Sequence, residues 1–348
     1  MLFESRDRVA PSFPRDSNLD WLRLASALQV VLVHFATHLD FALPPLVEHF
    51  PGVPAFFFIS GLLVYASCRN APGRPYFENR CLRIFPGLVF ATLGGAAVAL
   101  IAHGRGDLFD HFPTYAVWFL AQITLGQAYN PALFRDVGTG VVNGALWTLT
   151  VELLFYACVP LVIAMERRFR HALPALLAVS FLVYAIGPLI SGGAIYRNKT
   201  AYDVVALTPL AWGWMFGYGI LAGRHFNHVK RWLKHAPWLA APMLLMLMQG
   251  DGVWFGASGN RLGMFYFVCY AGLLLWFGFA LPVVRMPWDI SYGVYVWHLP
   301  VINLLLVLAI PSAALAIVLT CGMAALSCFA VERPALRLKR RSLKQVRA

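Results

Sequence analysis

The sequence predicts an all-α membrane protein, a polytopic bundle of about ten transmembrane helices with one further interfacial or re-entrant segment. Hydrophobic residues make up 59% of the 348 positions and the mean hydropathy is +0.65, which is too apolar for a water-soluble domain of this length. The apolar runs are continuous over roughly 20 residues, the length that an α-helix needs to cross a bilayer. They do not alternate with period two, as the strands of a membrane barrel would.

Ten apolar runs are suitable for spanning, although 53–68 and 236–250 are short. They are 20–40, 53–68, 83–103, 144–165, 172–190, 204–223, 236–250, 262–281, 290–310 and 312–330.

The segment 112–129 is an eleventh candidate, and it contains Gln122, Thr124 and Gln127. Basic clusters precede the first run and follow at Arg69–Arg83, Arg167–Arg170, Arg224–Lys234 and the C-terminal tail. Such clusters stay on the cytoplasmic side, so an even number of spans must separate each consecutive pair. Counting 112–129 as a span would break this rule, and we therefore expect it to be interfacial or re-entrant. Both termini are then cytoplasmic, and we expect the protein to lie in the inner membrane of the cell.

The formal charge of +12 comes from short clusters beside apolar runs, where topology and anionic lipid account for it. It does not indicate nucleic-acid binding. The six cysteines show no CxxC pairing and are interpreted as small buried hydrophobes. We expect 1–18 to be a cytoplasmic N-terminal segment, 19–334 one membrane domain and 335–348 a basic cytoplasmic tail.

Arg23 and His34 are the polar residues of the first apolar run. Eleven residues is close to three helical turns, so both lie on one helix face, about 16 Å apart along the axis. Arg23 would lie at the headgroup level and His34 near the bilayer midplane. An ionisable side chain at that depth suggests a function, although a neutral histidine bonded to a neighbouring helix is the open alternative.

Glu152 interrupts the apolar run "LWTLTVELLFY". A carboxylate among lipid tails is costly, so Glu152 must be protonated or have a partner. Its expected depth is comparable with that of His34, and a carboxylate beside an imidazole orients it for general-base catalysis. A structural pair between helices is the alternative.

Two further groups of residues stand at the cytoplasmic ends of runs. Arg80 and Arg83 are three apart on one helix face and, with Arg23, would form a cationic mouth suited to phosphate groups, unless they serve topology alone. In "DISYGVYVWHLPVI", Tyr292, Trp297 and His298 are expected to line a cavity. His34 and His38 lack a third ligand at a suitable spacing, so no metal site is predicted.

The segments "LDWLRLASALQVVLVHF", "FFFISGLLVY", "RCLRIFPG", "LWTLTVELLFY", "ISYGVYVWHLPV" and "VERP" occur in an order that resembles the acyltransferase 3 family of integral membrane acyltransferases. The resemblance runs from about Leu19 to Pro334. It implies a ten-helix membrane enzyme that moves an acyl group, commonly acetyl from a coenzyme A thioester, to a hydroxyl of a carbohydrate or another small acceptor.

The family's arginine-x10-histidine motif falls on Arg23 and His34, and its RxxR motif falls on Arg80 and Arg83. The resemblance also places Trp147 and Glu152 in the family's tryptophan-to-glutamate segment and Ser60 with Gly61 in its "SGLL" motif. We expect Ser60 and Trp147 to line a cavity. Trp21 departs from the glycine that is frequent after the aspartate in this family.

The sequence therefore predicts an O-acyltransferase in which acyl-CoA, as substrate and not as a resident cofactor, binds Arg23, Arg80 and Arg83. His34 would act as general base supported by Glu152, or would carry the acyl group covalently. The expected partners are acyl-CoA, a carbohydrate or glycolipid acceptor and membrane lipid. A transporter or flippase that uses buried His34 and Glu152, and a non-catalytic scaffold, are the alternatives.

Overall fold

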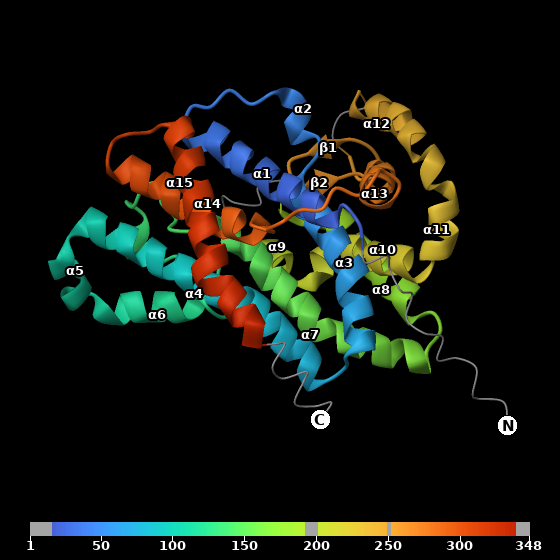
Figure 1. The fold of residues 1–348 in the computed structure, drawn as a ribbon, viewed down its shortest axis with the longest axis horizontal. Helices are drawn as coiled ribbons and strands as arrows, with labels where there is room; N and C mark the ends of the chain where they lie inside the picture. The colour runs from blue at the N-terminus through green and yellow to red at the C-terminus, as the bar shows by residue number, and fades with distance from the viewer. Residues whose placement is uncertain (1–15, 192–200, 249–251, 339–348) are drawn as a thin grey trace. The chain divides into compact units, whose positions relative to one another are not determined.

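The computed structural model describes residues 16–191, 201–248 and 252–338. The predicted N-terminal segment 1–18 and basic tail 335–348 therefore fall mostly outside the described residues. Helices dominate the described chain (Figure 1), as the continuous apolar runs predict. Six of them are long and apolar enough to cross a membrane: Leu19–His38, Pro45–Asn70, Arg74–His103, Gly144–Arg168, Asp203–Arg224 and Ala313–Leu338.

The chain divides into two compact units, and each is assembled from segments far apart in the sequence. Unit 1 comprises Met1–Leu22, Val53–Tyr76 and Phe155–Met286, and unit 2 comprises Arg23–Gly52, Phe77–Leu154 and Pro287–Ala348. Four helices pass from one unit into the other: α1 (Leu19–His38), α3 (Gly52–Asn70), α4 (Arg74–His103) and α7 (Trp147–Arg168).

Unit 1 holds the middle of the chain. Its further elements are α8 (Ala172–Ser191), α9 (Ala201–Ala206), α10 (Pro209–Arg224), α11 (Phe226–Trp232), the 3-10 helix η3 (Leu233–Leu239), α12 (Ala240–Leu247), the antiparallel strands β1 (Ala257–Ser258) and β2 (Arg261–Leu262), and α13 (Met264–Phe279). Helices α3 and α10 meet at glycines, because a side chain at Gly61 or Gly219 would collide with the backbone of Phe216 or Phe58. Small residues at such crossings are how helices pack closely in lipid.

The predicted run 236–250 does not form one long helix. A seven-residue 3-10 helix, η3, precedes the eight-residue α12. Eight α-helical residues extend about 12 Å, well short of the hydrocarbon thickness of a bilayer.

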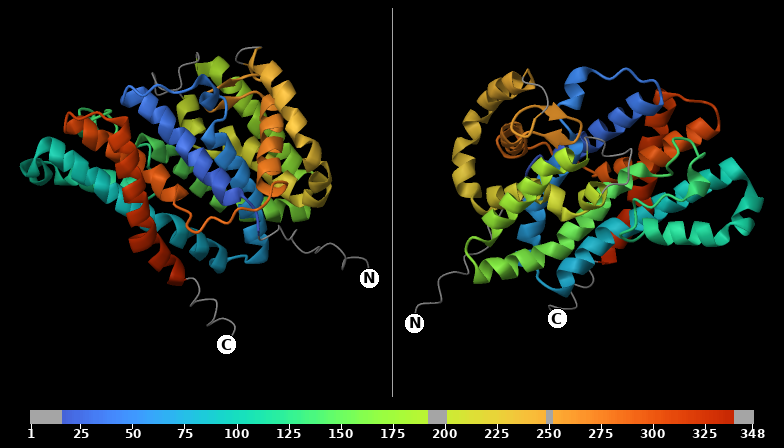
Figure 2. Two further views of the ribbon diagram at one scale, coloured as in Figure 1. Left: turned by 45° about the horizontal axis from the view of Figure 1, so that its top comes forward. Right: turned by 180° about the vertical axis from the view of Figure 1, so that it is seen from behind.

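Unit 2 holds most of α1 and α4 and the first turns of α7. Its further elements are α2 (Pro45–Glu48), α5 (Arg105–Asp110), α6 (Phe112–Gln122), the 3-10 helices η1 (Ala132–Phe134) and η2 (Gly144–Leu146), α14 (Ser291–Val307), α15 (Ala313–Leu326) and the π-helical η4 (Ser327–Glu332). Helices α14 and α15 form a hairpin in both views of Figure 2.

The segment expected to be interfacial or re-entrant begins as α6, which folds back along the C-terminal half of α4 with α5 at the turn (Figures 1 and 2). Its 11 residues extend about 16 Å, roughly half of what a span requires. Trp118 and Tyr115 pack edge-on against Phe134, which fixes this hairpin to the rest of unit 2.

Candidate active site

The candidate site lies within unit 2, where α1 and α14 run in the same direction and touch at two levels. Near their starts, Arg23 Nη1 donates to Asp289 Oδ2 at 2.8 Å. Eleven residues further along α1, His34 Nδ1 lies 3.1 Å from His298 Nε2 of α14. The spacing of Arg23 and His34 that the sequence predicts therefore places Arg23 against Asp289, two residues before α14, and His34 against His298 within α14.

The two histidines form a pair, which we call the histidine pair. Their ring centroids are 4.9 Å apart, and His298 is completely buried whereas His34 is only partly buried. His34 Nδ1 is also 3.0 Å from the carbonyl oxygen of Val30, and His298 Nδ1 is 2.6 Å from that of Tyr295. His38 extends the group with its ring parallel to that of His34 at 6.2 Å.

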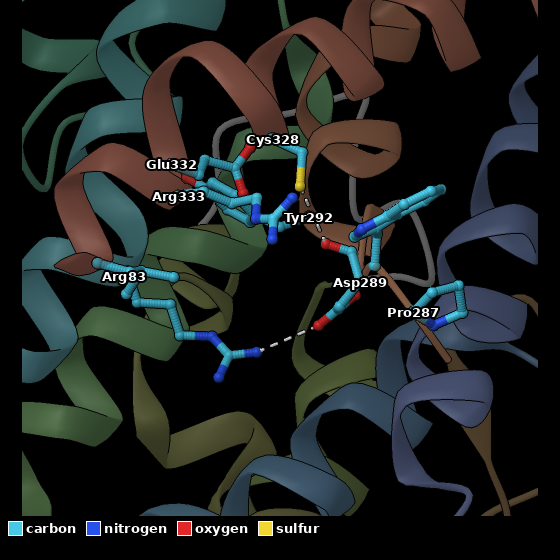
Figure 3. Close-up of a pocket in the computed structure, with 9 residues that line it drawn as sticks. Arg83, Pro287, Asp289, Tyr292, Cys328, Glu332 and Arg333 are labelled. Atoms are coloured by element: carbon cyan, nitrogen blue, oxygen red, sulfur yellow. Dashed lines mark hydrogen bonds and ion pairs between the residues drawn. The ribbon is translucent and has the colours of Figure 1, made fainter. Parts of the chain in front are cut away.

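The arginine end of the site contains a pocket of about 220 Å³ (Figure 3). Arg83 reaches across it toward Asp289, with Nη2 3.6 Å from Oδ2, so Asp289 receives guanidinium groups from both α1 and α4. The lining residues are Arg83, Pro287, Trp288, Asp289, Tyr292, Cys328, Glu332, Arg333 and Leu336.

The neighbours of Asp289 favour the charged form of its carboxyl group. Burial raises the pKa of its carboxyl, but the Arg23 guanidinium, hydrogen bonds from Ser291 and the nearby Arg83 together hold it below its usual value. A carboxylate between two arginines fixes where the guanidinium groups point. The arginine side chain of Arg83 is still 40% exposed and so remains accessible to a ligand.

Two glycines of α4 set how closely this helix approaches α14. A Cβ at Gly87 would lie 2.7 Å from the Tyr292 ring, and one at Gly94 would lie 2.3 Å from the Trp297 ring. Tyr292 also donates from its hydroxyl to the carbonyl of Ile84, one residue after Arg83. The aromatic residues of α14 therefore hold the arginine-bearing start of α4 against it.

Three of the residues expected to line a cavity have different surroundings. Tyr292 lines the pocket. Trp297 is 5% exposed and packs edge-on against Phe90, and its indole N–H has no hydrogen-bond partner among the described residues. His298 is a member of the histidine pair. Ser60 belongs to unit 1, whereas the other residues expected to line a cavity belong to unit 2.

Trp147 and Glu152 lie at the start of α7, which contacts α14. Thr148 hydrogen bonds to the Tyr295 hydroxyl, which donates to the carbonyl of Ala145 at 2.9 Å. Glu152 is one turn after Thr148 on the same face of α7. Among the described residues, however, His34 hydrogen bonds to Val30 and His298, and Glu152 is not one of its partners. A catalytic role for Glu152 stays a prediction.

Sequence reasoning missed Asp289, Glu332 and Arg333. Glu332 is buried, accepts a 2.7 Å hydrogen bond from Ser327 and lines the pocket with Arg333. All three lie in the segments "DISYG" and "VERP", whose neighbouring residues resemble family motifs. Asp289 could have been noticed because it is an acidic residue at the same end of the helices as the predicted arginine cluster.

A helical membrane protein with a histidine pair and an arginine-lined pocket on the same helices has the layout of a membrane-bound group-transfer enzyme. The acyltransferase-domain profile of the acyltransferase 3 family matches residues 16–333. The chain therefore belongs to this family, and it is a membrane O-acyltransferase.

Three curated relatives align with this chain over most of their lengths. Nodulation protein 10 of Rhizobium leguminosarum bv. viciae is 29% identical, with 93% of this chain and 94% of the relative covered. A putative acetyltransferase, ORF330, of Acidianus two-tailed virus is 25% identical, over 85% and 86%. The O-acetyl transferase of Shigella phage Sf6 is 24% identical, over 81% and 83%. No solved structure gives a significant match.

Proposed function

We propose that the enzyme transfers an acetyl group from acetyl-CoA to a hydroxyl of a carbohydrate or glycolipid. The observation that carries this proposal is a pair of contacts along α1. Arg23 contacts Asp289 of the arginine-containing pocket, and about 16 Å further along the helix His34 contacts His298. That separation is of the order of the reach of a pantetheine arm. Two relatives whose names specify acetyl transfer support the choice of acyl group.

The donor phosphates bind the guanidinium groups of Arg23, Arg80 and Arg83, of which Arg83 lines the pocket and Arg23 contacts the pocket residue Asp289. Arginine pairs with phosphate through several charge-assisted hydrogen bonds, and Arg23 and Arg83 already converge on one anionic group, Asp289. Arg80 lies one turn before Arg83 on α4. The pantetheine arm then runs along α1 and α14 and brings the thioester to the histidine pair.

His34 is the general base. Its imidazole takes the proton from the acceptor hydroxyl while the hydroxyl oxygen forms the new ester bond to the acyl carbon. The bond between that carbon and sulfur breaks, and the coenzyme A thiolate leaves and is neutralised by the proton that His34 received. Glu152, one turn after Thr148 on α7, is the carboxylate that we expect to support His34 in this role. Transfer through an acyl-histidine is the rival route.

The proposed setting is the inner membrane with both termini in the cytoplasm, which gives the arginine pocket access to cytosolic acetyl-CoA. The basic clusters beside the apolar runs support this orientation.

The test is transfer of labelled acetyl from acetyl-CoA by the purified protein in lipid nanodiscs, with a surface-glycan extract as acceptor. We expect label in the glycan, release of coenzyme A and loss of both in His34→Ala with donor binding retained. Full activity of His34→Ala would refute the mechanism. Solute flux without thioester consumption would instead identify a transporter.

A further inference from the structure

The protonation of the histidine pair follows from its hydrogen bonds. Each Nδ1 lies against a backbone carbonyl of its own helix, His34 Nδ1 at 3.0 Å from Val30 and His298 Nδ1 at 2.6 Å from Tyr295. A carbonyl oxygen can only accept, so each of these Nδ1 atoms must carry a proton. The opposite tautomers would place nitrogen lone pairs against oxygen lone pairs at both positions.

A neutral imidazole with its proton on Nδ1 has a lone pair on Nε2. The Nε2 lone pair of His298 faces His34 Nδ1 at 3.1 Å, so the Nδ1 proton of His34 is shared between Val30 and His298. The lone pair of His34 is then on Nε2, the nitrogen that none of the described residues engages.

We propose that His298 is a positioning residue that fixes the tautomer and ring orientation of His34, so that His34 Nε2 faces the acceptor hydroxyl as a base. This inference rests on the proposed function. When His34 Nε2 takes the hydroxyl proton, the ring becomes positive and its Nδ1–H bonds strengthen, because charge-assisted hydrogen bonds are the stronger kind. His298 thus fills the place that a carboxylate fills in a Ser-His-Asp triad, without burying a negative charge.

Two variants of His298, both with neutral and polar side chains, test whether His298 positions His34 or only fills space. In His298→Gln, the side-chain amide reaches the position of Nε2, and its oxygen can accept from His34. In His298→Asn, the shorter amide reaches only the position of Nδ1, where it can donate to Tyr295. We expect His298→Asn to lower kcat about 100-fold with an unchanged KM for acetyl-CoA, and His298→Gln to recover most of that loss.

Equal activity of the two variants, at the wild-type level or at a shared low level with donor binding retained, would overturn the proposal. The tautomer can also be measured in the unaltered protein, by ¹⁵N NMR of histidine-labelled enzyme with the His34 signals assigned by their loss in His34→Gln. Protonation of His34 at Nδ1 supports the proposal, and protonation at Nε2 in the donor-free enzyme refutes it.

These outcomes are distinguishable from failure of the proposed function. If His34→Ala remains active, the general-base mechanism itself is wrong. If His34→Ala is inactive while His298→Asn matches the wild type, His34 is catalytic but does not depend on His298.

Discussion

Unit 2 contains two histidine sites with opposite surroundings. In the histidine pair, the neighbours of the imidazoles are backbone carbonyls and each other. At the end of α4, both ring nitrogens of His103 face carboxylates, Asp107 at 3.2 Å and Asp136 at 3.0 Å. Each ring nitrogen of His103 thus lies against a carboxylate oxygen, whereas in the histidine pair no described residue engages His34 Nε2. The comparison indicates that what surrounds a histidine decides whether a ring nitrogen stays available for chemistry.

Replacement of each histidine by glutamine should produce the largest contrast. His34→Gln is expected to lower the rate of acetyl transfer by about 10²- to 10⁴-fold, because the base is lost. His103→Gln should retain transfer while lowering the temperature of unfolding, because the contacts of both ring nitrogens with Asp107 and Asp136 are lost. Initial rates with labelled acetyl-CoA and thermal unfolding in nanodiscs measure both. Equal loss of transfer in the two variants would remove the distinction between the sites.

The next effect concerns the donor. Arg83→Ala should raise the KM for acetyl-CoA about 10-fold, the lower end of what a charge-assisted hydrogen bond contributes, because Arg83 is partly exposed. Arg337→Ala is the matched control, since Arg337 is exposed and is not among the residues that line the pocket. An equal rise of the KM in Arg83→Ala and Arg337→Ala would mean that these arginines attract the donor only through their charge, and it would contradict a specific role for Arg83.

The ionisation of Asp289 makes the stability of the folded protein depend on pH. The surroundings lower the folded-state pKa of its carboxyl, so its stabilising contribution is present above the unfolded-state value of about 3.9 and is lost as the pH falls through the folded value. Asp289→Asn should lower the free energy of unfolding by about 1 kcal/mol at pH 7 and should weaken the loss of stability in acid. Thermal unfolding of donor-free protein from pH 7 downward tests this, and an unchanged acid slope would contradict it.

The smallest effect is expected at the second histidine site, where Tyr115 and His103 contact Asp107. Tyr115 donates a 2.9 Å hydrogen bond to Asp107, and Tyr115→Phe removes it while keeping the ring against Phe134. We expect the temperature of unfolding to fall by about 1–2 °C and transfer to stay unchanged. Tyr129→Phe, at an exposed tyrosine, is the control and should change neither. Lost transfer in Tyr115→Phe would give this site a part in the reaction.

Much of the fold could be predicted because lipid imposes a local rule on the sequence. A helix must satisfy its own backbone over about 20 apolar residues, so each predicted run coincides with helical residues. Two runs are interrupted. The run 236–250 contains Pro237 within the 3-10 helix η3 and continues as α12, and the run 204–223 is divided between α9 and α10, which begins at Pro209. Helix α6 ends at Gln122, before Thr124 and Gln127, so the segment 112–129 contains only a short helix.

The candidate site could be predicted only in part. The spacing of Arg23 and His34 is a property of one helix and is readable from the sequence. Their partners Asp289 and His298 lie more than 260 positions away, and no local pattern states which helix faces α1. For the same reason the sequence indicates a carboxylate, Glu152, as support for His34 but does not indicate the contact with His298, because that contact depends on tertiary packing.

Gly87 and Gly94 give the site one further property. They are seven residues apart, so both lie on the face of α4 that presses against the aromatic rings of α14, and neither position has room for even a methyl group. Helix α4 therefore cannot slide or roll along its neighbour without a clash. Arg83 and the histidine pair are thereby held at a fixed separation. If the proposed function is correct, acyl carriers with shorter or longer arms would bring their thioesters to the wrong depth.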